Sequence, residues 1–104
     1  MAKPHAPRFV RLGATQVDAL FGAGTGLRPR IQISGGRFVA RERVALVGRS
    51  GRLEGVAVVG PVEERVTVRL SPGDLERLGL DNGGGLLLVG PQGEVHITEG
   101  IVAT

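Results

Sequence analysis

Two arginines occupy matching places in the sequence, each near the end of a short apolar run. Arg11 lies in Val10-Arg11-Leu12 and Arg69 lies in Val68-Arg69-Leu70, and a helical pattern follows each run. A guanidinium group is a permanent cation whose planar donors suit phosphate and carboxylate groups. The pair therefore predicts an anion site if both side chains line one cleft. If they point into open water, the chain is a scaffold.

Other groups that could do chemistry are scarce. The chain has no cysteine, which excludes disulfides, thiolate chemistry and Cys-type zinc sites. The two histidines, His5 and His96, lack metal-ligand spacing, and the alternation of His96 with Val95 and Ile97 favours an outward, solvated imidazole. Ser71 is better explained as a helix cap than as a nucleophile. Catalysis by this chain alone therefore has little support in the sequence.

Charge is unevenly distributed along the chain. Residues 1–52 hold ten Lys and Arg against two acids, a net charge of +8, whereas residues 53–104 hold three Arg against eight acids, a net charge of −5. This asymmetry suits an anionic ligand on the basic half or association between unlike surfaces of two copies. Solvated faces that cancel within one fold explain it equally well. With three phenylalanines for stacking and no binding motif, the chain gives no support to nucleic-acid binding.

The elements that position these residues are short strands. A length of 104 residues, 18 glycines and only 3 % aromatics predict one domain of many short strands separated by turns. We expect a flexible arm at residues 1–7 and a single domain at residues 8–104. No apolar run approaches the roughly 18 residues that span a membrane, and the N-terminal segment has no signal-peptide pattern. A cytoplasmic protein without membrane contact is expected.

Each arginine belongs to a unit in which a strand leads into a helix. The first unit predicts a strand over Arg8–Leu12 and a helix over Thr15–Phe21, with Thr15 as the cap and Asp18 completing a capping-box-like pair. In the second unit, Ser71 is the expected N-cap of a helix that begins at Pro72 and ends at Gly79.

Each unit is followed by a hairpin pattern. The first hairpin covers residues 38–59 and the second residues 86–97, and Leu46-Val47-Gly48 matches Leu88-Val89-Gly90. The first copy carries about 16 extra residues around 24–40, which include an edge strand at Leu27–Ile33 with Arg28 and Arg30 on one face. The predicted fold class is mainly β: a small closed β-barrel of short antiparallel strands, internally duplicated and capped by two short α-helices.

Several blocks of the sequence resemble the phosphate propanoyltransferases of the PduL type. These blocks are Leu20-Phe21-Gly22, residues 38–48, Leu53-Glu54-Gly55-Val56, Val59-Gly60-Pro61, residues 87–93 and Glu99-Gly100-Ile101-Val102. The resemblance implies a phosphotransacylase associated with bacterial microcompartments, built from two β-barrel domains with two zinc ions between them. It covers roughly Arg8–Thr104 and corresponds to the first of the family's two domains.

The resemblance also indicates where the family's functional residues would lie. Its zinc motif Arg-His-Val-His-Leu-Ser falls on residues 8–13, so that Phe9 and Arg11 stand at two histidine positions. A glutamate ligand corresponds to Arg69, and an arginine thought to hold phosphate corresponds to Glu63. Guanidinium groups repel a dication, so we expect no zinc and no other resident cofactor.

We interpret the chain as a family domain that has lost its zinc site and acts as a non-catalytic binding or assembly module, a pseudoenzyme. A homo-oligomer or a related PduL-like chain is the expected partner, in the cytoplasm or within a microcompartment. The ligand would be CoA or another anion, and the candidate binding residues are Arg11, Arg69, Arg28, Arg30, Arg41 and Arg43. Two alternatives stay open: a phosphate acyltransferase or CoA-binding protein that needs a second domain or partner, and an engineered or truncated scaffold.

Overall fold

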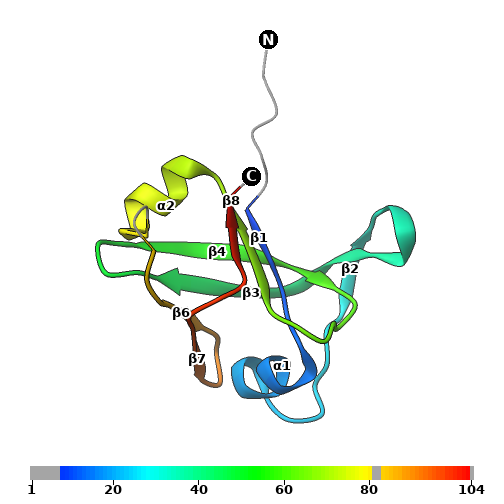
Figure 1. Ribbon diagram of the computed structural model, residues 1–104. Helices are drawn as coiled ribbons and strands as arrows, with labels where there is room; N and C mark the ends of the chain where they lie inside the picture. The colour runs from blue at the N-terminus through cyan, green and yellow to red at the C-terminus, as the bar shows by residue number, and fades with distance from the viewer. Residues whose placement is uncertain (1–7, 81–82, 104) are drawn as a thin grey trace.

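The computed structural model describes residues 8–80 and 83–103, and strands are its main regular structure (Figure 1). The arm expected at residues 1–7 and part of the loop after the second helix lie outside the described residues. The elements in chain order are β1 (Phe9–Arg11), α1 (Ala14–Phe21), β2 (Pro29–Gln32), the 3₁₀ turn η1 (Ser34–Gly36), β3 (Phe38–Val47), β4 (Arg52–Gly60), β5 (Thr67–Leu70), α2 (Pro72–Leu78), β6 (Leu86–Val89), β7 (Glu94–Ile97) and β8 (Ile101–Ala103).

The strands form one curled sheet. Their order is β7-β6-β3-β4-β1-β5-β8, and β2 pairs with β3 off this path. Alternate residues of β1 and β5 face the core: Val10, Val68 and Leu70 are fully buried. The prediction of a mainly β fold is confirmed.

Strand pairing confirms the internal duplication. Val10 and Val68, which are equivalent in the two copies, are direct partners in the antiparallel pair of β1 and β5. Leu46 and Leu88, also equivalent, are direct partners between β3 and β6. An approximate two-fold axis therefore relates the two copies, and it passes between the partners of each pair.

Each hairpin turn packs against the helix of the other copy. The turn between β3 and β4 reaches α2, where the Ser50 N–H donates to the Leu78 carbonyl at 3.1 Å. The turn between β6 and β7 reaches α1, where the Gln92 N–H donates to the Leu20 carbonyl at 2.9 Å. These crossed contacts join the two halves of the chain.

The sheet is open, whereas the sequence predicted a closed barrel. In the first copy, the continuous strand β4 pairs with β3 and also with β1. The corresponding part of the second copy is interrupted at residues 98–100, so β7 pairs with β6 and β8 pairs with β5. Gly100 takes a φ of +87° and its carbonyl accepts the Val68 N–H, which redirects the chain at the break. Within the described residues the sheet therefore ends at β7 and β8.

The two helices are capped differently. In α2, Ser71 Oγ accepts the Asp74 N–H and Gly79 ends the helix in the left-handed conformation, as predicted. For α1, the helix begins one residue earlier than predicted, at Ala14, and the predicted cap Thr15 was wrong. Gly13 is the N-cap, and the Gln16 side chain, not Asp18, accepts its N–H at 3.0 Å. Neither helix is long and apolar enough to cross a membrane, among the residues described.

Candidate functional site

Arg11 and Arg69 lie on the same face of the sheet. Phe9 and Arg69 are direct partners across the β1–β5 ladder, and Arg11 is opposite Thr67. Direct partners and residues two apart on a strand share a face, so all four side chains lie on one side, away from buried Val10. Diagonal neighbours on an antiparallel pair, such as Arg11 and Arg69, are about 7–8 Å apart.

Two further candidates from β3 join this face. Phe9 is paired with Ala57 of β4, which is in turn paired with Arg43 of β3, so Arg43 shares the face with Phe9. Arg41 is exposed like Arg43, whereas Glu42 between them is buried. The structure thus gathers four of the six candidate arginines on what we call the arginine face: Arg11, Arg41, Arg43 and Arg69.

Arg11 is partly enclosed on this face. One of its terminal nitrogens lies 3.8 Å from a Glu63 carboxylate oxygen, and its guanidinium carbon lies 5.5 Å from the centre of the Phe9 ring. The side chain is 20 % exposed, and its Nε is buried without a hydrogen-bond partner among the described residues. Arg11 therefore carries one partly compensated charge and one unmatched donor.

Arg28 and Arg30 belong to a different region, the hairpin of β2 and β3. The Arg28 backbone N–H and Nε donate to the two carboxylate oxygens of Glu42, at 2.9 and 2.7 Å. Burial raises the pKa of Glu42, but these hydrogen bonds and the nearby positive charge outweigh burial and hold the pKa below its ordinary value. Arg30 is exposed on the edge strand β2. Arg28 therefore forms an ion pair with Glu42 inside the chain, and no sequence pattern predicted this pair.

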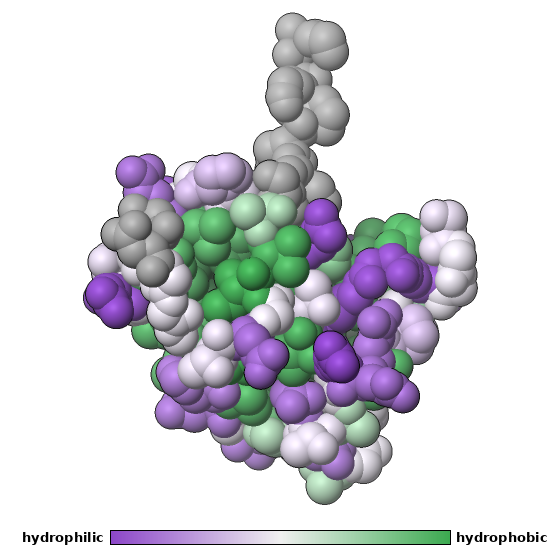
Figure 2. Space-filling view, viewed as in Figure 1, coloured by the Kyte–Doolittle hydropathy of each residue, from purple (hydrophilic) through white to green (hydrophobic). Residues whose placement is uncertain are grey.

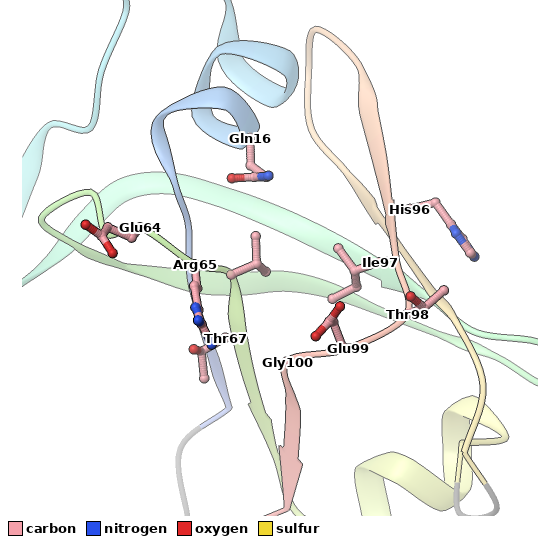
Figure 3. A pocket seen from close by; sticks show the side chains of 10 residues that line it. Gln16, Glu64, Arg65, Thr67, His96, Ile97, Thr98, Glu99 and Gly100 are labelled. Carbon is pink, nitrogen blue, oxygen red and sulfur yellow. The ribbon is translucent and has the colours of Figure 1, made fainter.

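A hollow of about 740 Å³ opens at the break between β7 and β8 (Figure 3). Residues from α1, from the segment leading into β5 and from the break line it: Gln16, Glu64, Arg65, Val66, Thr67, His96, Ile97, Thr98, Glu99 and Gly100. His96 is exposed, as predicted. No sequence pattern indicated this hollow, because it depends on the interruption of the second copy's last strand.

Comparison with known proteins identifies the family. The sequence model for phosphate propanoyltransferase matches residues 5–104. The chain belongs to the phosphate propanoyltransferase family. It is 36 % identical over 106 residues to a phosphate propanoyltransferase of Rhodopseudomonas palustris, covering 91 % of this chain and 47 % of that protein. It is 33 % identical to the enzyme of that name from Thermotoga maritima, covering 91 % of this chain and 50 % of the relative. The chain thus spans about half the length of these relatives.

Membership of the phosphate propanoyltransferase family raises the question of zinc. The three positions that the resemblance assigns to zinc ligands, Phe9, Arg11 and Arg69, share one face of the sheet. Phe9 has no donor atom, and guanidinium groups are cations at neutral pH, so this set of side chains does not fit a zinc ion. Across residues 8–80 and 83–103, no group of three or more His, Asp or Glu side chains is placed to hold a metal.

Proposed function

We propose that this chain is a phosphate propanoyltransferase-family domain that has lost the zinc site and acts as a non-catalytic binding or assembly module. The observation that supports this most is the ion pair between Arg11 and Glu63. By the resemblance, these positions hold a zinc-binding histidine and a phosphate-binding arginine in the family. In this chain the Arg11 guanidinium and the Glu63 carboxylate form an ion pair at the positions that would hold a metal ligand and a phosphate-binding group.

The proposed ligand is an anion with one or more phosphate groups, and CoA is the first to test. Arg11 and Arg69 are close enough on neighbouring strands to hold one phosphate between them. Arg43 and Arg41 lie farther along the same face, two and more strands away, where they could hold further phosphates of an extended ligand.

Calorimetric titration with CoA and with inorganic phosphate tests this proposal. Saturable CoA binding is expected, and the double variant Arg43→Met/Arg69→Met should weaken it at least about tenfold, since each charged hydrogen bond contributes about 1.5–3 kcal/mol. Arg77→Met, an exposed arginine of α2, is the control that should bind CoA like the parent. Equal binding by both variants would exclude the arginine face as the site.

We also propose that two copies associate and so reproduce the two-domain organisation that the resemblance implies. The chain spans about half of its relatives, and its two halves carry opposite net charge. Sedimentation velocity at high micromolar concentration should show a dimer or larger species. A strict monomer would contradict this part of the proposal. Location within a bacterial microcompartment is proposed from the resemblance alone.

A second candidate function is acyl transfer between acyl-CoA and phosphate, with a second domain or partner chain supplying the missing groups. The half-length match to phosphate propanoyltransferases favours it. Metal analysis and an assay with acyl phosphate and CoA separate the two functions. Turnover, or zinc bound in stoichiometric amount, would overturn the non-catalytic proposal.

A further inference from the structure

The duplication allows the surroundings of the two helices to be compared position by position. Gln16 of α1 and Asp74 of α2 are the third residues of their helices, and each side chain accepts a hydrogen bond from the N-cap N–H. The equivalent residues are 58 positions apart, as are Val10 and Val68. By the same spacing, Arg8 before β1 corresponds to Val66 before β5.

At the α2 end, a guanidinium group fills the space beside the helix. Arg8 Nε lies 3.1 Å from Asp74 Oδ2 and Arg8 Nη2 lies 3.0 Å from Asp74 Oδ1, a two-pronged contact between the start of β1 and the first turn of α2. Asp74 is buried, with 7 % of its surface exposed. The space beside Asp74 is thus occupied by the guanidinium group of Arg8.

At the α1 end, the equivalent space is the hollow of about 740 Å³. Val66 stands where the first copy has Arg8, and its short side chain places no charged group beside Gln16. Figure 3 shows Gln16 extending from α1 on one side of the opening, with Ile97 and Glu99 on the other. The hollow is therefore the unfilled counterpart of the arginine site at α2.

Glu99 is the charged group that faces the opening. Its carboxylate takes part in no ion pair among the described residues and points into the opening (Figure 3). Glu64 and His96 point away from the opening on opposite sides, and the Arg65 side chain runs away from Gln16. Apolar atoms of Val66 and Ile97 provide a surface for an alkyl stem beside the carboxylate.

We propose that this hollow binds a ligand that carries a guanidinium or primary ammonium group on a short alkyl chain. Glu99 is the charged partner, the Gln16 side chain lies on the opposite wall, and the alkyl chain lies on Val66 and Ile97. The proposal does not depend on the arginine face, which has the opposite charge and uses other residues. The two can therefore succeed or fail separately.

A ¹H–¹⁵N NMR titration with ethylguanidinium tests the proposal, with butylammonium in parallel to distinguish a guanidinium site from an ammonium site. Saturable shift changes are expected at Gln16, Val66 and residues 97–100. Glu99→Gln should weaken binding about tenfold, because one charge-assisted contact is lost. Glu94→Gln, an exposed glutamate of β7 outside the hollow, is the matched control and should bind like the parent.

A second variant fills the hollow from within the chain. Val66→Arg restores the residue type of the first copy and should abolish the ethylguanidinium shifts while the rest of the spectrum stays folded. Because Glu99 is exposed, Glu99→Gln keeps the test decisive even if Val66→Arg does not fold. Shifts that are unchanged in Glu99→Gln, or that arise at these residues with phosphate instead of the cations, would overturn the proposal.

Discussion

At the scale of single residues, Glu42 is a buried acid whose charge is compensated within the fold. It lies between two exposed arginines, and its two carboxylate oxygens accept from the backbone and side chain of Arg28. The contact anchors the chain just before β2 to the middle of β3. Removal of the charge would leave two donors of Arg28 with a weaker acceptor.

We predict that Glu42→Gln lowers the free energy of unfolding by about 1–3 kcal/mol, the usual cost of weakening a buried charged hydrogen bond. Urea unfolding followed by circular dichroism measures the change. Glu54→Gln is the control: its pair with Arg52 is exposed on both sides and should change the unfolding free energy by less than about 1 kcal/mol.

Glu42 also predicts a pH dependence. Its pKa is lower in the folded chain than in the unfolded chain, where a glutamate titrates near about 4.3. The folded state therefore binds this proton less readily, so the stabilisation is fully present above pH about 4.3 and is lost as the pH falls through the folded pKa. Thermal melts from neutral pH down to about pH 3 should show this loss in the parent, and a smaller one in Glu42→Gln. Equal losses would assign the acid sensitivity to other carboxylates.

At the scale of elements, the crossed contacts between hairpins and helices join the two copies. Gly48 and Gly90 are equivalent glycines at the starts of the two turns. A Cβ at Gly48 would lie 2.1 Å from the Leu78 carbonyl oxygen, and one at Gly90 would lie 2.5 Å from the Leu20 carbonyl oxygen. Both positions require glycine because a helix backbone approaches them closely.

We predict that Gly48→Ala and Gly90→Ala each lower the free energy of unfolding by about 1–3 kcal/mol, because a rigid backbone must move to admit the methyl group. Gly73→Ala is the control, since its Cβ would have no contact closer than 3.8 Å and alanine favours a helix. It should leave stability unchanged or raise it by up to about 1 kcal/mol. Chemical denaturation of the three variants measures the difference, and tolerance of alanine at both turns would contradict the crossed arrangement.

At the scale of the whole molecule, apolar side chains remain on the surface near the open end of the sheet. Figure 2 shows hydrophobic residues gathered over β8 and beside α2, next to hydrophilic ones. Leu75, Leu80, Ile101 and Ala103 line a smaller hollow there, of about 270 Å³, and Val102 is 38 % exposed. Such a surface is compatible with the association proposed above.

The salt dependence of the proposed association should show whether charged or apolar contacts dominate it. If the basic and acidic halves of two copies meet, the sedimentation coefficient at fixed protein concentration should fall as the salt concentration rises from about 0.05 to about 0.5 M, because exposed charges are screened. Retention of the larger species in high salt would instead assign the contact to apolar surface.

The sequence by itself determined the elements and their repetition. Turn glycines, the Ser71-Pro72 cap and the alternation of apolar residues are local signals, so the second helix, both hairpins and the duplication were predictable. The family was also recognisable, since blocks spread over nearly the whole chain carry it. The cap of the first helix was placed two residues too late, at Thr15, because the glycine N-cap has no side chain to mark it.

Only the tertiary structure decided what those elements bring together. Strand register placed Arg11, Arg69 and Arg43 on one face. Packing of distant segments formed the ion pairs of Arg11 with Glu63 and of Arg28 with Glu42. The sheet stayed open because the chain is redirected at Gly100, a feature that no strand pattern encodes. Register and closure arise from contacts between residues far apart in the chain, whereas sequence patterns report only on neighbours.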